Sequence, residues 1–185
     1  MRYKLTTKEK VKAKLNIDNT DEDTIIDDII YGVTGTITAL IGKELNEKSR
    51  TYATEDGTVF LPVTPVTSIE TVSDWNGTEY VDRENLPRFK ASGEVDLCAG
   101  PGFETVKITY TAGYKIDFDN EDDEEQHNLP AEISELAGRL AVRHYRKLEH
   151  EGEASTSYET STTSWQDLVR PEDYDIINNH RSTWI

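Results

Sequence analysis

The residues with the clearest chemical potential are seven carboxylates gathered in one short segment of the chain. They lie within residues 115–128 and are Asp117, Asp119, Glu121, Asp122, Asp123, Glu124 and Glu125. Asp117, Asp119 and Glu121 alternate as the first ligands of a calcium loop do. The pattern then fails, because Asp122 stands where the loop needs glycine and Asn128 where it needs glutamate. Like charges at this density cannot pack together, so we predict a solvated loop that binds no metal.

Other catalytic and metal-binding signatures are absent from the sequence. The single cysteine, Cys98, excludes an intramolecular disulfide, and no Cys/His cluster has the spacing of a zinc site. Of the four histidines, only His144 falls on an apolar helical stripe, which favours a hydrogen-bonded core or interface residue. The sequence has neither a G-x-S-x-G elbow nor a phosphate-binding loop. We therefore predict no enzyme activity and no cofactor. A cation-dependent hydrolase that uses the carboxylates of residues 117–125 is the alternative from another class.

The charge balance is strongly acidic, with 36 Asp and Glu against 20 Lys and Arg and a formal net charge of −16. Such a chain repels polyanions, which argues against a general nucleic-acid binder. Residues 1–15 are opposite in sign, because Lys8, Lys10, Lys12 and Lys14 follow one another at every second place. We predict that these four lysines bind a partner. The chain shows no apolar signal region and no stretch of roughly 18 apolar residues, so we expect no membrane association.

The spacing of apolar residues predicts three helices, at 7–15, 21–42 and 130–150. The second has the strongest pattern, with an apolar residue at every fourth place. These residues are Ile25, Ile29, Val33, Ile37 and Ile41. Gly32 and Gly35 inside this helix indicate either the close approach of a neighbouring element or plain tolerance of glycine.

Between the second and third helices, residues 51–114 change to a period of two and are rich in β-branched and aromatic residues. Asn76-Gly77 predicts a two-residue hairpin turn, followed by a return strand over 78–81. Two further strands, 94–97 and 105–110, are expected to pair across the turn that separates them. We predict a small antiparallel sheet.

The last segment, residues 151–185, has the composition of an extended arm that ends in a short helix. Its first half consists mostly of Ser, Thr, Glu and Tyr, which cannot form a core. Pro171 is suited to open the terminal helix. Tyr174, Ile177 and Trp184 are candidate partner-binding anchors on this helix and after it.

Together these elements predict an α+β fold that is mainly helical. Two long amphipathic helices and a short N-terminal helix surround a small antiparallel β-rich insertion, and an extended C-terminal arm carries a terminal helix. We expect a single core over residues 1–150, which includes the β-rich insertion and the acidic loop, and a separate arm over 151–185.

Several motifs follow one another along the chain. They are LNID at 15–18 followed by DED at 21–23, LPVTPVTSIETV at 61–72, VKITYTAGY at 106–114, and the Leu129-Pro130 pair that opens a helix. In type and order they resemble the head-tail connector, or adaptor, family of long-tailed bacteriophages. The motifs span roughly residues 5–150. The acidic loop and the C-terminal arm depart from the family's pattern.

This resemblance implies a structural virion protein without catalytic residues. Such a protein is made in the host cytoplasm and assembles as a ring, expected to be a dodecamer, beneath the portal vertex in the virion neck. The implied partners are the portal protein, a stopper or tail-completion protein, further copies of the chain, and viral double-stranded DNA that passes through without specific binding. The acidic residues 117–125 are then expected to face the channel. A stopper or tail-completion protein is the alternative within the same class.

Overall fold

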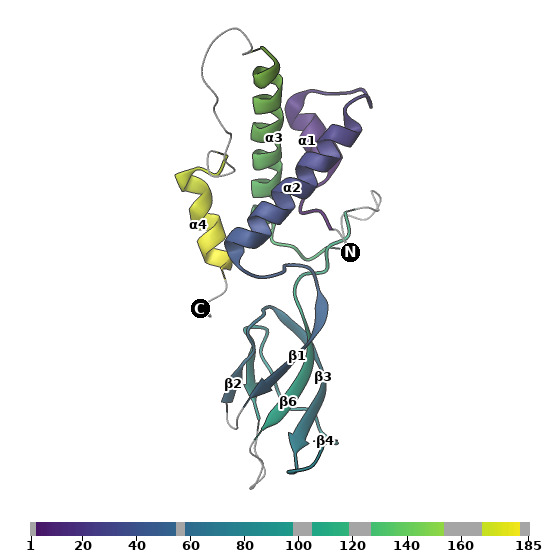
Figure 1. The fold of residues 1–185 in the computed structure, drawn as a ribbon, viewed down its shortest axis with the longest axis vertical. Helices are drawn as coiled ribbons and strands as arrows, with labels where there is room; N and C mark the ends of the chain where they lie inside the picture. The colour runs from purple at the N-terminus through teal and green to yellow at the C-terminus, as the bar shows by residue number, and fades with distance from the viewer. Residues whose placement is uncertain (1–2, 55–57, 98–104, 119–126, 154–167, 182–185) are drawn as a thin grey trace. The chain divides into compact units, whose positions relative to one another are not determined.

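The computed structural model describes residues 3–54, 58–97, 105–118, 127–153 and 168–181, which form four helices and six strands (Figure 1). The helices are α1 (Lys8–Leu15), α2 (Asp23–Ile41), α3 (Ala131–Glu153) and α4 (Pro171–His180). The strands are β1 (Lys48–Thr54), β2 (Thr58–Phe60), β3 (Val66–Trp75), β4 (Tyr80–Asp82), β5 (Glu94–Asp96) and β6 (Val106–Ala112). The structure confirms the α+β class without confirming that the fold is mainly helical.

The chain divides into two compact units. The helical unit comprises Met1–Lys43 and Lys115–Arg181 and contains all four helices. The β unit, Glu44–Tyr114, contains all six strands and is inserted between α2 and α3. This division differs from the expected single core over 1–150 with a separate arm. The reason is that the strands have a hydrophobic core of their own, while α4 packs on α2 and α3.

Local sequence signals set the ends of the first two helices. The Thr7 hydroxyl accepts a hydrogen bond of 3.2 Å from the Lys10 backbone N–H and so caps the start of α1. This helix ends at Asn16, which has the left-handed conformation with φ 59°. The second helix ends at Gly42, where φ is 78° and glycine carries no steric penalty.

The helical unit is built around the apolar face of α2. The buried residues of this helix are Ile26, Ile29, Ile30, Val33, Thr34, Ile37 and Ile41. Each of the other three helices contacts α2 and adds buried residues, among them Val11, Leu136 and Ile177. Ile25, which was expected on this face, is 50% exposed. A strict repeat of four drifts round a helix by about 40° at each step, so the buried face has to combine steps of three and four.

Among the described helices, α2 alone is long and apolar enough to cross a membrane by length and composition. This corrects the expectation that the chain holds no such stretch. The apolar side chains on one face of α2 are buried against the other helices of the unit, which is the environment of a core helix. The hydropathy of α2 is therefore accounted for by the core it builds.

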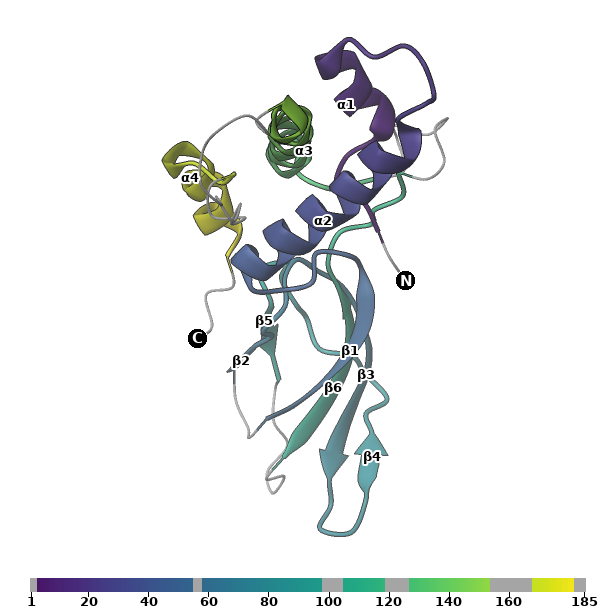
Figure 2. The same ribbon diagram turned by 45° about the horizontal axis from the view of Figure 1, so that its top comes forward.

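The β unit contains a four-stranded sheet in the order β1-β6-β3-β4 and a two-stranded sheet of β2 and β5. All strand pairs are antiparallel. Side chains alternate along β6, which places Val106, Ile108, Tyr110 and Ala112 in the core. Buried residues from both sheets form one hydrophobic cluster, so the sheets share a core. Figure 2 shows the strands of the two sheets beside each other.

The hairpin between β3 and β4 has a wider loop than the sequence predicted. It lies at Asn76-Gly77 as expected, but the loop has four residues, because Trp75 pairs with Tyr80. The Asn76 side-chain carbonyl accepts a hydrogen bond of 2.9 Å from the Thr78 backbone N–H. This local bond stabilises the longer loop, as asparagine commonly does in turns.

The expected pairing of the strands at 94–97 and 105–110 is wrong. In the structure β5 pairs with β2, whereas β6 lies between β1 and β3. The pattern of β6, with a buried residue at every second place, suits a central strand as well as an edge, so periodicity alone could not identify its neighbours.

The chain enters and leaves the β unit through two segments held together by backbone hydrogen bonds. We call these segments, residues 45–47 and 113–114, the stem. The Tyr114 N–H donates to the Leu45 carbonyl at 2.7 Å, and the Glu47 N–H donates to the Tyr114 carbonyl at 2.8 Å. The two ends of the inserted unit are thus fixed beside each other.

Gly113 is required by the geometry of the stem. Its φ is 118°, and a Cβ at this position would lie 2.6 Å from the Asn46 carbonyl oxygen. Its N–H donates to the Pro65 carbonyl at 2.9 Å. The motifs at 61–72 and 106–114 therefore meet at the stem, where the second motif needs glycine.

Candidate partner-binding surfaces

Three of the four predicted lysines on α1 form ion pairs within the helical unit. Lys8 Nζ lies 2.8 Å from Asp23 Oδ2, and Lys12 Nζ lies 2.7 Å from Asp23 Oδ1. Lys14 pairs with Glu135 on α3. The positive charge of α1 therefore contributes to holding α1, α2 and α3 together.

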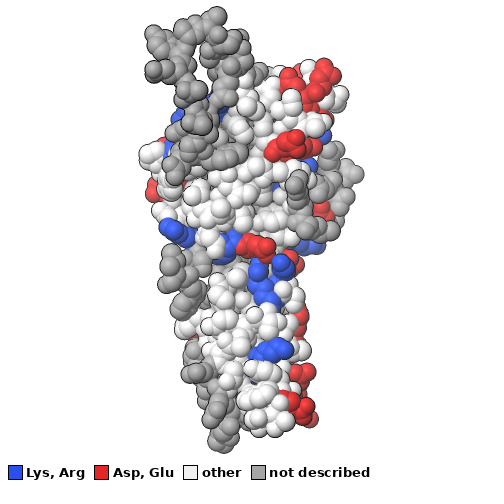
Figure 3. All heavy atoms as spheres, viewed as in Figure 1, with Lys and Arg blue, Asp and Glu red and all other residues white. Residues whose placement is uncertain are grey.

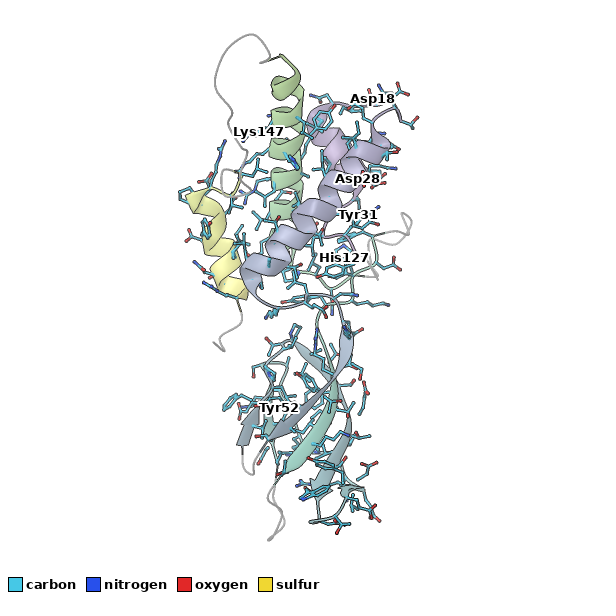
Figure 4. The ribbon with its side chains drawn as sticks, in the orientation of Figure 1. Asp18, Asp28, Tyr31, Tyr52, His127 and Lys147 are labelled. Atoms are coloured by element: carbon cyan, nitrogen blue, oxygen red, sulfur yellow. The ribbon has the colours of Figure 1, made fainter. Side chains whose placement is uncertain are left out.

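Lys4, which was not among the predicted lysines, also forms an ion pair with α2. Lys4 Nζ lies 3.0 Å from Asp27 Oδ1. The same Nζ is 5.2 Å from the centre of the Tyr31 ring, which is labelled in Figure 4. The N-terminal segment is thus attached to α2 by a charge pair and a cation–π contact.

The contacts with lysine hold the pKa of the Asp23 carboxyl below its ordinary value, first through the hydrogen bond from Lys12 and then through that from Lys8. The hydrogen bond to Asp23 also raises the pKa of Lys8. A carboxyl whose pKa is lower in the folded state stabilises the fold above its unfolded pKa, and this contribution is lost as the pH falls. We therefore expect the contact between α1 and α2 to weaken only in acid, below about pH 4.

The side chain of Lys10, the remaining one of the four predicted lysines, lies in different surroundings. It is exposed, and its Nζ lies 5.8 Å from the centre of the Phe118 ring. The Phe118 ring packs in turn on His127, with 4.5 Å between ring centres. Lys10 is therefore placed beside both ends of the acidic loop, next to solvent.

Most of the predicted acidic surface lies outside the described residues. Asp117 is described and is partly buried. Asp119, Glu121, Asp122, Asp123, Glu124 and Glu125 belong to the segment that the structure does not describe. In the described part of the chain, no group of three or more His, Cys, Asp or Glu side chains is placed to hold a metal ion. The channel-facing position of the acidic loop remains a prediction.

The three predicted C-terminal anchors have different surroundings. Ile177 is buried, with 2% of its surface exposed, so its side chain contributes to the core of the helical unit. Tyr174 on the same helix is 38% exposed and can contact another molecule. Trp184 lies outside the described residues. Partner binding through α4 therefore stays a prediction. Of the three predicted anchors, Tyr174 is the one that is both described and exposed.

A buried ion cluster attaches α4 to α3. The Asp173 side chain is fully buried and pairs with Arg143 and, at 3.1 Å, with Arg139. Its Oδ2 also accepts a hydrogen bond of 2.9 Å from the Arg170 backbone N–H at the start of α4. Arg143 Nη1 donates to the Leu168 carbonyl at 3.1 Å. One carboxylate thus caps α4 and forms ion pairs with two arginines of α3.

The sequence contains two separate signals for this cluster. Arg139 and Arg143 are one helical turn apart, and Pro171 is suited to open a helix whose first turn contains Asp173. Neither signal indicated that the two would meet. The pairing is a long-range contact, so local patterns could not reveal it.

The β unit exposes several large apolar side chains. They are Phe60, Tyr80, Val81, Leu86 and Phe89, each at least 38% exposed. The Tyr80 ring lies 5.1 Å from that of Trp75 and 5.4 Å from Lys107 Nζ. Acidic side chains gather at the β3–β4 hairpin, at the lower right of Figure 3, where Glu79, Asp82 and Glu84 are exposed. This mixture of apolar and acidic groups makes the hairpin a candidate contact surface.

Comparison with known proteins identifies one family. The model of the family described as head completion protein matches residues 4–183, almost the whole chain. No curated protein matches it.

Two solved structures have a similar fold. A chain from the neck of an empty gene transfer agent particle, computed with C6 symmetry, is 14% identical, with a TM-score of 0.53 over 89% of this chain and 81% of that one. A chain from the virion of a native gene transfer agent particle is 16% identical, with a TM-score of 0.51 over 89% and 80% of the two chains. At these identities the likeness is one of fold alone.

Proposed function

Because this chain belongs to the head completion protein family, we propose that it is the head-tail connector, or adaptor, of a tailed virus particle. In this role it forms a ring beneath the portal vertex, joins the head to the tail and lets the genome pass. The observation that carries the proposal is the family match over residues 4–183. The fold shared with a chain of a gene transfer agent neck supports the same position in the particle.

The distribution of exposed groups supports a role in assembly. A head-to-tail ring needs two different complementary surfaces on each subunit, and further surfaces for the proteins above and below it. The helical unit exposes Ile25, Leu148 and Tyr174, and the β unit has the apolar and acidic groups of its hairpin. Each unit therefore offers contact surface of its own, with the portal, a stopper or tail-completion protein and neighbouring copies as the proposed partners.

Electron microscopy of the purified protein mixed with portal tests the proposal directly. Rings docked on the portal, expected to contain twelve subunits, would support a connector. A stopper is the second candidate. Stoppers tend to consist mostly of β-structure, so the β unit with a core of its own favours this candidate. A stopper would fail to bind portal alone and would bind only after the connector is in place.

The acidic loop is expected to keep DNA from adhering to the ring. Replacing the carboxylates of residues 117–125 with Asn and Gln should leave assembly and thermal stability near those of the parent. Retention of duplex DNA by the assembled ring should increase at low salt, because adhesion depends on how phosphate charge is repelled or neutralised. A filter-binding titration against ionic strength measures this. Equal retention by mutant and parent rings would refute the role in the channel.

Lys10 allows docking to be separated from folding. Lys10→Glu should leave the melting temperature unchanged and weaken association with the portal, most strongly at low salt, because screened surface charges are the mechanism. Lys12→Glu is the matched control: it places a carboxylate against Asp23 and should lower the melting temperature by a few degrees. Calorimetry and a salt series of portal binding give both readouts. Portal binding by the Lys10 variant that equals the parent's at every salt concentration would remove α1 from the docking surface.

A further inference from the structure

The fourth helix lies antiparallel to α3 and is fixed at both of its ends. Near the start of α4, Asp173 pairs with Arg143 in the middle of α3. Near its end, the His180 ring is hydrogen-bonded to Glu132 in the first turn of α3. Figures 1 and 2 show α4 beside α3 in both views.

The chain that links these two helices is longer than their arrangement requires. Ten residues of α3 follow Arg143, which corresponds to about 15 Å of helix. Seventeen residues, 154–170, link the two helices. The fourteen of them that precede Leu168, whose carbonyl contacts Arg143, can span at most roughly 46–50 Å. Connections between neighbouring helices in bundles commonly have about 2–8 residues. The fully extended link is therefore about 30 Å longer than the stretch of α3 that it must run back along to place α4 on its own chain.

We propose that α4 of each subunit docks on α3 of the neighbouring subunit in the assembled ring, through the contacts that it makes within its own chain here. This inference rests on the proposed ring. Both arrangements use the same side chains, so the exchange keeps the contact energy and changes only which subunit supplies the helix. In a closed ring the neighbour's α3 is held at an effective concentration of about millimolar, which is enough to compete with the intrachain site.

The chemistry of the site selects a second copy of this chain as the occupant. A buried carboxylate must reach Arg139 and Arg143 while it caps its own helix. An apolar residue four positions later, here Ile177, must enter the core at the same time. A helix without this pattern would leave the two arginines unpaired or the apolar site empty, and both are costly.

Crosslinking decides between the two arrangements. Two proteins are made in a Cys98→Ser background, one with Glu132→Cys and the other with His180→Cys. They are mixed, assembled with portal and treated with a short bismaleimide. Only exchange can then join two chains, so covalent dimers are expected in the ring fraction. The protein that carries both cysteines in one chain is the control, and it should give chains of two or more subunits in rings. If every crosslink within rings is intrachain, the exchange is refuted.

Charge reversal gives an independent readout. Asp173→Arg and Arg143→Asp should each reduce ring formation by at least about tenfold, the effect of roughly 1.4 kcal/mol. An equimolar mixture should restore rings, because every exchanged contact in an alternating ring pairs opposite charges. A single chain that carries both substitutions should restore rings whether α4 pairs within its own chain or with the neighbour. It is the control that shows that the reversed ion pair is tolerated. Failure of the mixture with success of the double variant would refute the exchange alone. Failure of the parent protein to form rings on the portal would refute the proposed connector and the exchange together.

Discussion

Asp173→Ala should lower the free energy of unfolding of the helical unit by about 3 kcal/mol. The substitution removes a fully buried carboxylate and with it the ion pairs that this carboxylate makes with Arg139 and Arg143. This value is at the lower end for breaking a buried ion pair, because the two arginine side chains are 36% and 20% exposed and can turn to water. Denaturant unfolding followed by the helical circular dichroism signal measures the change.

Tyr174→Ala is the matched control for this experiment, because Tyr174 follows Asp173 on the same helix and is exposed. It should change the stability little. Deletion of residues 168–185 should cost at least as much as Asp173→Ala, since it also removes Ile177 from the core. This replaces the expectation from the sequence that the C-terminal segment is separable from the folded core. A deletion variant as stable as the parent would show that α4 contributes nothing to the unit.

Gly113→Ala should destabilise the β unit by about 3 kcal/mol, the upper end of the cost of one strained backbone position. The φ of 118° is unfavourable for any side chain, and the added Cβ would lie 2.6 Å from the Asn46 carbonyl oxygen. Backbone atoms of the stem would have to move, with loss of the hydrogen bond from Gly113 to Pro65. Denaturant unfolding followed by tryptophan fluorescence reports this, because Trp75 is in the β unit.

Gly35→Ala should have the opposite sign and stabilise the protein by up to about 1 kcal/mol. Gly35 lies inside α2, and an added Cβ would meet nothing within 4 Å. The close approach considered from the sequence is therefore not made at this position within the chain. If Gly113→Ala proved as harmless as Gly35→Ala, the stem would not have the geometry described. If Gly35→Ala blocked ring formation while stabilising the subunit, a neighbouring subunit would approach α2 there.

The sequence predicted the elements whose signals are local and failed where distant residues meet. The helices were found because their apolar residues repeat along a few turns, and the hairpin at Asn76-Gly77 because its turn residues are adjacent. The strand β1 was only partly recognised, since its residues are mostly exposed and show no apolar alternation. The partners of β5 and the packing of α4 depend on residues far apart in the chain, which no periodicity encodes.

The candidate site was predicted only in part for the same reason. The charge of α1 was evident, but the use of Lys8 and Lys12 in binding Asp23 requires α1 and α2 to be placed side by side. By contrast, the motifs that carried the family resemblance are explained by geometry. The motifs at 61–72 and 106–114 are joined by the hydrogen bond from the Gly113 N–H to the Pro65 carbonyl, so their residues help to close the β unit. The match of the head completion protein family over residues 4–183 confirms that resemblance.

The stem also determines the order in which this chain is expected to fold. Residues 42–130 separate α2 from α3, so the helical unit can form only after a long loop has closed. When the β unit folds first, the backbone bonds at Leu45, Glu47 and Tyr114 bring the ends of its insertion together and shorten that loop to roughly a quarter of its length. The entropic cost of closing the loop then falls by about 1 kcal/mol. We therefore expect pulse-labelled hydrogen exchange to show protection in β6 before protection appears in α3, because the β unit folds before the helical unit.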